Sequence, residues 1–367
     1  MSESTGATSV SDERDALVER LFGATLAAMD LFSVYLGEKM GFYRALSSSE
    51  SMTSTQLATA TDAHERYVRE WLEQQAVTGL LEVSLNNAEA TLREFRLPPG
   101  HIEPLTDPDS LVTMTPLVQI LAGCVKPIDQ VLDAYRSGGG VPFEAYGTDL
   151  IEGQAGSTRP MFLHQLTQEW LAAMPDVFKR LTTGEDARIA DIGMGLGLSS
   201  IAMAKAFPNV LVDGFDLDEA SVAAARDKAE EAGVADRVSF HVRDAGDPEL
   251  AGRYDLALAV ECIHDMSDPV STLRSIGRLV GDGGTVFIAD ERVADTFAAP
   301  GDDVERYMYG FSILQCLPVG MVDQPSVATG TVMRSSTLLQ YATEAGYSAA
   351  EVLPLEHDFF RFYRLTA

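Results

Sequence analysis

A regular alternation of short apolar strands and helices in the second half of the chain most constrains its fold. The strands are expected at 188–192, 210–216, 238–242, 254–261 and 285–289, and the first two connecting helices at 199–207 and 219–232. Parallel strands joined by helices are buried on both faces, which explains why these segments are almost uniformly apolar. We therefore predict an α/β fold with a Rossmann-like, doubly wound sheet in this half of the chain.

The first hundred residues follow a different pattern. An apolar stripe at helical spacing runs from Leu17 to Met40, a short helix ends at Ala60, and another opens at Asp62 with Tyr67 on its apolar side. Strands are expected at 79–83 and 91–97, and this order is typical of a winged helix. The second of the two short helices balances its bases with acids, which disfavours DNA binding. We expect a mainly α dimerisation domain whose long apolar helix is covered in part by a second subunit.

The two patterns and the segment between them divide the chain into three parts. We predict a winged-helix dimerisation domain at 1–105, a helical linker contributing to the pocket at 106–180, and a Rossmann-like catalytic domain at 181–367. An amphipathic helix at 161–181 is expected to lead into the last part.

Composition limits the partners. The chain of 367 residues has 55 acidic and 27 basic side chains, so its net charge of −28 argues against a nucleic-acid partner. No apolar run approaches the roughly 18 residues needed to cross a bilayer, and the polar start lacks the features of a signal peptide. The cysteines Cys124, Cys262 and Cys316 are far apart in the sequence, as expected in a reducing cytoplasm.

The turn after the first predicted strand carries the clearest ligand-binding motif. Gly193, Gly195 and Gly197 alternate with other residues and follow Asp191. Alternating glycines let a ligand lie against bare backbone, but a dinucleotide site would favour the spacing G-x-G-x-x-G. S-adenosylmethionine has no pyrophosphate and presents an amino-acid end instead. An acid in the place of Asp191 can meet its ammonium group directly or through water.

Two further acids follow the next two strands. Asp216 ends the second strand, where a carboxylate can bridge both ribose hydroxyls of a nucleoside. Asp244 follows the third strand and is placed to accept from an adenine amino group. We expect these acids to bind the cofactor together with three neighbouring residues, namely Leu217, Ala245 and Glu261.

These motifs resemble those of a known family. The segments 190–197, 214–218 and 279–291 are similar to class I S-adenosylmethionine-dependent methyltransferases. Residues 262–268, Cys-Ile-His-Asp-Met-Ser-Asp, resemble the His-Asp-Trp-Ser-Asp stretch of small-molecule O-methyltransferases, which also carry an N-terminal winged-helix dimerisation domain. The chain looks closest to actinobacterial members with His-Asp-Met there and an Arg-Phe-Tyr-Arg-like strand at 361–364. The resemblance implies a cytoplasmic homodimer acting in secondary metabolism on a natural-product intermediate.

The resemblance also implies catalytic roles. His264 matches the general base of the O-methyltransferases, Asp265 is placed to orient the imidazole or support the cofactor, and Glu291 fits one of the family's supporting glutamates. An imidazole, with an unperturbed pKa near 6.5, is suited to take the proton of an acceptor hydroxyl. Met161 and Phe162 match a segment that contacts cofactor and substrate, so we expect them to form pocket walls.

Several departures leave the reaction open. Met266 replaces the usual tryptophan, and the second supporting glutamate has no match at 330–334. Methylation of carbon or nitrogen, a non-methylating elimination or rearrangement, and a ligand-sensing regulator therefore stay as alternatives. We predict no metal site, because the third ligands available beside His264 and Asp265 are the distant His164 and His357.

Overall fold

The computed structural model describes residues 9–184, 186–243 and 254–367. Asp244 and Ala245 of the predicted cofactor site lie outside these residues. The chain forms two compact units, Met1–Ala122 and Gly123–Ala367. The finer division at 105/106 and 180/181 stays a prediction.

The first unit is a winged helix, as the sequence predicts. Its elements are α1 (Val10–Lys39), α2 (Phe42–Ser47), β1 (Met52–Thr53), α3 (Ser54–Ala60), α4 (Glu65–Val77), β2 (Glu82–Leu85), the 3-10 turn η1 (Ala90–Leu92), β3 (Glu94–Arg96) and α5 (Pro99–Thr106). The strands pair in the order β1-β3-β2, and β3 is antiparallel to both neighbours. Helix α6 (Thr115–Val125) crosses the boundary between the units.

Trp71 is the centre of the core of the first unit. Its ring lies 4.8 Å from the Phe42 ring and 5.2 Å from the Tyr43 ring. A side chain at Gly37 would begin 2.4 Å from the Trp71 ring, so only glycine lets α1 approach α4 this closely. Most apolar side chains of α1 are exposed within this unit. They include Leu17, Val18, Leu21, Phe22, Leu26, Met29 and Leu36.

Some boundaries in the first unit differ from the predicted ones. Helix α4 begins at Glu65, because His64 accepts the Arg66 N–H as its N-cap. Asp62, predicted to open this helix, has a left-handed φ of 50° and belongs to the preceding turn. Tyr67, predicted on the apolar side, is 79% exposed.

The second unit contains the predicted strands and helices in order. Its first elements are α7 (Ile128–Ser137), η2 (Phe143–Tyr146), α8 (Gly147–Met161), η3 (Phe162–Trp170), η4 (Leu171–Ala173), α9 (Pro175–Thr183), β4 (Ala187–Ile192), α10 (Leu198–Ala206), β5 (Val210–Asp216), α11 (Glu219–Glu231) and β6 (Val238–Val242). The later ones are β7 (Leu256–Val260), η6 (Ile263–Asp265), α12 (Pro269–Val280), β8 (Thr285–Glu291), α13 (Asp303–Phe311), η7 (Ser312–Cys316), α14 (Leu317–Gly320), α15 (Ser335–Ala345), β9 (Ala349–Val352) and β10 (Phe360–Thr366).

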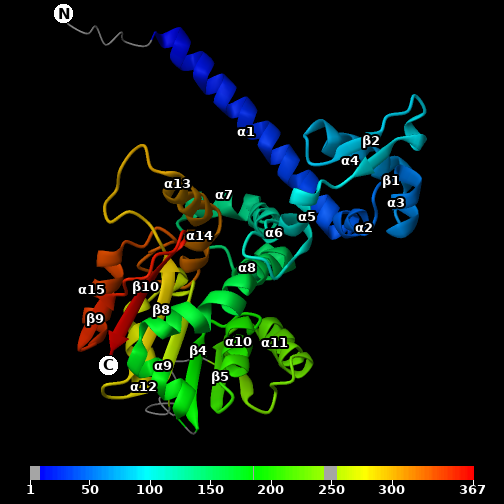
Figure 1. The fold of residues 1–367 in the computed structure, drawn as a ribbon. Coiled ribbons are helices and arrows are strands. Elements are labelled where there is room, and N and C mark those ends of the chain that lie inside the picture. The colour runs from blue at the N-terminus through cyan, green and yellow to red at the C-terminus, as the bar shows by residue number, and fades with distance from the viewer. Residues whose placement is uncertain (1–8, 185, 244–253) are drawn as a thin grey trace, which may run out of the picture. The chain divides into compact units, whose positions relative to one another are not determined.

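The sheet of the second unit has the strand order β6-β5-β4-β7-β8-β10-β9. Strands β6, β5, β4, β7 and β8 are parallel, whereas β10 inserts antiparallel between β8 and β9. Figure 1 shows β4, β8 and β10 among the helices that enclose the sheet. The prediction of a Rossmann-like, doubly wound sheet with an N-terminal winged helix is confirmed.

Successive residues of the strands are buried on opposite faces of this sheet. Ile189 and Leu258 pack in the cluster that also holds side chains of α10 and α11, whereas Ala190 and Ala259 pack in the cluster with α12 and α15. Burial on both faces explains the uniformly apolar strands. The parallel strands then deliver their carboxyl ends, and the loops that follow them, to one edge of the sheet.

The helix predicted at 161–181 is interrupted. The chain leaves α8, passes through the π-helical segment η3 and the turn η4, and restarts at Pro175 in α9. The break before α9 has a local cause, because Pro175 has no N–H to donate to the helical hydrogen bonds of the preceding segment. Segments of π-helix occur frequently beside functional sites.

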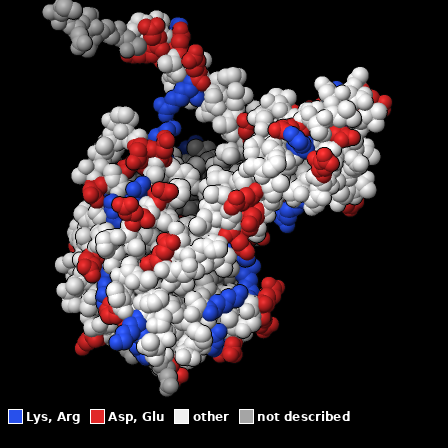
Figure 2. Space-filling model, in the orientation of Figure 1, with Lys and Arg blue, Asp and Glu red and all other residues white. Residues whose placement is uncertain are grey.

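Figure 2 shows acidic side chains scattered over the visible face, with the basic ones in small separate groups. Within the described ranges, no helix is both long enough and apolar enough to traverse a bilayer.

Candidate active site

The glycine turn after β4 is shaped by backbone conformations that favour glycine. Gly193, Gly195 and Gly197 have φ angles of 65°, 51° and 73°. A side chain at Gly197 would start 2.5 Å from Phe240, so this position also needs glycine for packing. At Gly195 an added Cβ meets no atom within 4 Å, which leaves open space beside the backbone. The turn therefore offers bare backbone to a ligand, as the motif predicts.

Asp191, the residue before the last of β4, is a buried carboxylate without a basic partner among the described residues. It is 2% exposed, and its Oδ2 accepts from the hydroxyls of Ser199 and Ser200, both at 2.6 Å. Burial raises the pKa of Asp191 to about 6, although the two hydrogen bonds oppose this shift. A buried carboxylate held only by hydroxyls gains stability from a nearby cation.

Asp216 is fixed at the end of β5 by two backbone amides. Its Oδ2 accepts the Gly195 N–H and its Oδ1 accepts the Asp218 N–H, both at 2.9 Å. The first bond ties the carboxylate to the glycine turn, 21 residues earlier. The next residue, Leu217, is 73% exposed and leaves an apolar surface beside this carboxylate.

Glu261 follows β7 in a conformation that is unusual for a side-chain-bearing residue. Its φ is 52°, in the left-handed region, and its N–H donates to the Ala289 carbonyl at 2.9 Å. Burial raises the pKa of Glu261 to about 7. The charge of His264 opposes this shift, and the charges of Asp290 and Asp265 add to it. Such strain is common where a structure fixes a functional side chain.

His264 lies in the 3-10 turn η6 after β7 and is 2% exposed. Its Nδ1 lies 2.9 Å from Asp290 Oδ1 and also 2.9 Å from Glu291 Oε2. Asp290 Oδ1 additionally accepts the Glu291 N–H at 3.0 Å, which fixes the carboxylate toward the ring. The imidazole is therefore held through Nδ1 by the end of the neighbouring strand β8, and Nε2 is left for other contacts.

The surrounding carboxylates determine the protonation of this cluster. Burial alone would lower the pKa of His264, but the charges of Glu291, Asp290 and Asp265 hold it well above its ordinary value. Burial works against ionisation of Asp290, yet His264 keeps the pKa of that carboxyl below its ordinary value. Burial raises the pKa of Glu291 well above normal. Of the two acids on β8, Asp290 is therefore the more readily ionised.

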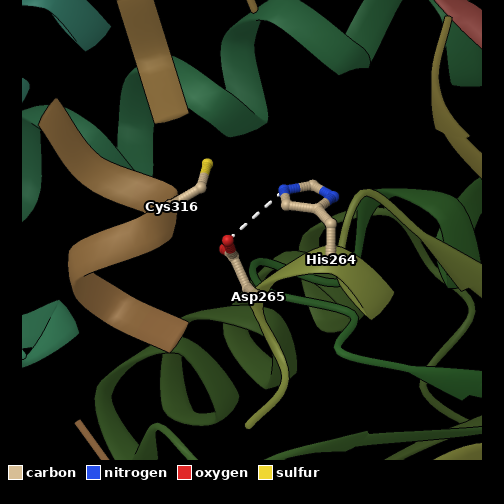
Figure 3. Close-up of side chains that lie close together, drawn as sticks. All are labelled: His264, Asp265 and Cys316. Carbon is tan, nitrogen blue, oxygen red and sulfur yellow. Dashed lines mark ion pairs between the residues drawn. The ribbon is translucent and has the colours of Figure 1, made fainter. Parts of the chain in front are cut away.

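The other side of the ring faces Asp265 and Cys316, which Figure 3 shows around a common space. Asp265 Oδ1 lies 3.3 Å from His264 Nε2. Cys316 belongs to the π-helical segment η7, and its S–H donates to Gln315 Oε1 at 3.1 Å. His264 Nε2 is thus the nitrogen that faces Asp265.

The two predicted pocket walls belong to the core of the second unit. Met161 is half-buried, and Phe162 is 7% exposed with its ring 6.3 Å from that of Trp170. Their contacts are those of helix packing, and their role toward a substrate stays a prediction.

Sequence reasoning missed several residues of the site. They are Asp290, Ser199, Ser200, Gln315 and Cys316. Asp290 and the serines had a signal, since Asp290 lies within the segment 279–291 and the serines open the helix predicted at 199–207. Cys316 lies 52 positions after His264, and the sequence offered no pattern that joins them.

This combination of sheet order, glycine turn and edge carboxylates defines a class of enzyme, the class I methyltransferases. A family model described as "Methyltransferase domain" matches residues 184–340, and one described as "Rv2258c-like winged HTH domain" matches residues 27–107.

Curated relatives agree with these models. The ubiquinone biosynthesis O-methyltransferase of Pseudomonas aeruginosa (strain UCBPP-PA14) is 32% identical over 174 residues, which are 47% of this chain and 68% of the relative. The 27-O-demethylrifamycin SV methyltransferase of Amycolatopsis mediterranei (strain S699) is 35% identical over 120 residues, 32% of this chain and 44% of the relative. The chain belongs to the class I S-adenosylmethionine-dependent methyltransferases and carries an N-terminal winged-helix domain.

A solved structure matches nearly the whole chain. The mitomycin 7-O-methyltransferase MmcR superposes with a TM-score of 0.69, covers 97% of this chain and 99% of its own, and is 19% identical. At this identity the likeness shows a shared fold. The family resemblance inferred from the motifs is confirmed.

The buried Asp191 carboxyl predicts a pH effect on stability. Its raised pKa means that the folded carboxyl holds its proton more tightly than the unfolded one, whose pKa is about 3.9. The stabilisation is complete below that value and is lost as the pH rises to about 6. Relative to Asp191→Asn, the ligand-free wild type should lose about 2–3 kcal/mol of unfolding free energy between pH 4 and pH 7.5.

Urea unfolding at both pH values measures this difference. Asp227→Asn, at an exposed position of α11, is the matched control and should follow the wild type. Equal pH dependence of the wild type and Asp191→Asn would contradict this account of the buried carboxylate.

Proposed function

We propose that the chain transfers the methyl group of S-adenosylmethionine to a hydroxyl of a small-molecule acceptor, with His264 as the general base. The observation that carries the proposal is the buried His264–Asp290 pair, 2.9 Å apart, at the edge of the sheet that also carries the glycine turn. When bound, S-adenosylmethionine supplies a methyl carbon made electrophilic by the adjacent sulfonium. The product would leave with S-adenosylhomocysteine.

The residues at the edge of the sheet fit this cofactor. Asp191 is a buried carboxylate with no positive partner among the described residues, and an ammonium group of the cofactor would neutralise it. Two backbone amides fix Asp216 in the place suited to ribose hydroxyls, and Leu217 offers an apolar surface to the adenine ring. Gly193, Gly195 and Gly197 leave room beside the backbone. Asp244, Ala245 and Glu261 stay proposed members of the site.

His264 would act through Nε2. Asp290 holds Nδ1–H by a charge-assisted hydrogen bond, so the neutral ring has its free electron pair on Nε2. An acceptor hydroxyl that displaces the Asp265 contact would donate its proton there. The ionised Asp290 then stabilises the imidazolium, as the orienting carboxylate does in other carboxylate–histidine pairs. Asp265 would hold the acceptor or the ring, and Glu291 would support the Nδ1 side of the ring beside Asp290.

Methylation at carbon or nitrogen and a non-methylating use of the cofactor remain the rivals. A panel of phenols and enols, amines and activated carbon acids, assayed for release of S-adenosylhomocysteine, separates these reactions. Release with hydroxyl acceptors, lost by at least about 10²-fold in His264→Ala, supports the proposal. Conversion of the substrate in the presence of the cofactor, without release of that product, would support elimination or rearrangement and would contradict methyl transfer.

The pH profile of the reaction gives a sharper prediction. Only the neutral imidazole accepts a proton, so kcat/KM should rise with pH, with a midpoint above the ordinary histidine value of about 6.5. Asp290→Asn removes the neighbouring charge, lowers the pKa of His264, and should move this rise to lower pH while lowering kcat. Glu291→Gln should move the rise to lower pH by less, because the pKa of Glu291 is raised and its carboxyl is the less readily ionised of the two.

The two variants are matched, because each is a single amide replacement on β8 within 2.9 Å of the same nitrogen. The assignment of Asp290 as the ionised partner would be contradicted by a larger pH shift in Glu291→Gln than in Asp290→Asn.

The acceptor class is proposed from the relatives. Two of the similar proteins are named for rifamycin and mitomycin methylation, which supports a natural-product acceptor and a role in secondary metabolism. The cysteines Cys124, Cys262 and Cys316 are free, which supports a cytoplasmic enzyme.

We also propose a homodimer formed through α1. Leu21, Phe22 and Met29 are 58%, 64% and 62% exposed, an apolar density that favours contact with a second copy. Multi-angle light scattering should give twice the chain mass for the wild type and for the control Glu19→Gln. The double variant Leu21→Glu, Met29→Glu should give a larger share of monomer. A monomeric wild type at micromolar concentration would contradict the proposal.

A further inference from the structure

Three different metal-ligand types meet on the Nε2 side of His264. The ligand atoms of His264, Asp265 and Cys316 all lie within 4.8 Å of one another. The sequence offered only His164 and His357 as third ligands, whereas the fold brings a cysteine from 52 positions later to this point. Figure 3 shows His264 and Asp265 on the turn after β7 and Cys316 on the facing helical segment.

The spacing of these atoms suits a tetrahedral ion better than a hydrogen bond. His264 Nε2 and Asp265 Oδ1 are 3.3 Å apart. Nitrogen and oxygen ligands bound to zinc at about 2.1 Å are separated by about 3.4 Å in a tetrahedron. The Cys316 sulfur lies within 4.8 Å of both atoms. Because Zn–S bonds are about 2.3 Å long, it would need to move toward them by about 1 Å.

Unsatisfied polar atoms mark the same place. Asp265 Oδ1 is buried and makes no hydrogen bond to any described residue. Gln315, beside Cys316, is 1% exposed, and its Nε2 also has no partner within the described part of the chain. Buried polar atoms are normally paired, so a cluster of orphaned ones indicates a missing ion, water or ligand.

The Nδ1 side of the same ring is different. There Asp290 Oδ1 accepts both the His264 N–H and the Glu291 N–H, at 2.9 and 3.0 Å, so hydrogen bonds account for its geometry. Asp290 Oδ2 and Glu291 Oε2 also lack a hydrogen-bond partner among the described residues, and His264, Asp290 and Glu291 form a second group of possible ligand atoms. Only the Nε2 group includes a thiol, a ligand that favours zinc.

Charge favours a cation here. Four carboxyl groups, from Glu261, Asp265, Asp290 and Glu291, act on the single imidazole of His264. Tyr146, which interacts with Asp265 and Cys316, and Tyr307, which interacts with Glu261, are phenols and bring no positive charge. The π-helical turn η7 places Gln315 and Cys316 inward together, both at least 96% buried.

We infer that His264 Nε2, Asp265 and Cys316 form a binding site for one zinc ion. Thiolate, imidazole and carboxylate are a donor set that selects zinc over the hard cations magnesium and calcium. The inference rests on the proposed function in one respect: Nε2 is the nitrogen proposed to accept the acceptor proton. A bound zinc ion occupies that nitrogen, so zinc inhibits methyl transfer and competes with the acceptor.

Competition with a chromophoric chelator measures the binding, on full-length protein first stripped of metal. The expected result is one zinc per chain for the wild type and for Cys124→Ala, which removes another buried cysteine. Cys316→Ala and Asp265→Asn should each weaken zinc binding by at least about tenfold. Cobalt provides a second readout, since a thiolate-to-cobalt charge-transfer band should appear in the wild type and be absent from Cys316→Ala.

Each outcome decides the inference. Far-UV circular dichroism and S-adenosylhomocysteine binding identify variants that fail to fold, and Cys316→Ser replaces Cys316→Ala in that case. Absence of zinc binding by the wild type, or equal binding by a folded Cys316 variant, overturns the site. Methyl transfer by the metal-free protein tests the proposed function separately: activity without zinc binding removes only this inference, and zinc binding without activity removes only the proposed reaction.

Discussion

Parallel pairing of β6, β5, β4, β7 and β8 is the constraint on which the site depends, because it brings the carboxyl ends of these strands to one edge. The glycine turn follows β4, Asp216 ends β5, and the turn with His264 follows β7. Asp290 lies near the end of β8 and reaches the imidazole across the β7–β8 pair. Side chains up to 99 positions apart, from Asp191 to Asp290, therefore belong to one edge although nothing in their local sequence links them.

Residues next to a strand end could be predicted from the sequence. A strand is identified by its uniform apolarity, and polar residues near its carboxyl end are then placed at the edge, as Asp191 and Asp216 were, whereas His264 was identified from the family resemblance of 262–268. The sheet order confirms this reasoning for the fold. The limits of helices were less predictable, because single residues at their ends decide them. His64 caps the start of α4, and α9 begins at Pro175 after the π-helical segment.

Contacts that depend on register or on distant helices could not be predicted. Asp290 and Glu291 are both acids at the end of β8, and the opposite shifts of their pKa values follow from the burial and the contacts that the fold gives each carboxyl. The bonds of Ser199 and Ser200 to Asp191 require the first turn of α10 to be placed over the strand end. Cys316 enters the cluster only because η7 packs there, a tertiary event with no local signal.

The central claim is that this edge of the sheet binds S-adenosylmethionine through a preorganised set of carboxylates and glycines. Calorimetric titration of the intact chain with S-adenosylmethionine, beside Asp216→Ala, tests this claim most directly. The account predicts one site of micromolar affinity in the wild type and a loss of at least about tenfold in the variant, since the variant loses a carboxylate fixed by the Gly195 and Asp218 amides. No binding by the intact chain, or equal binding by a folded Asp216→Ala, would contradict it.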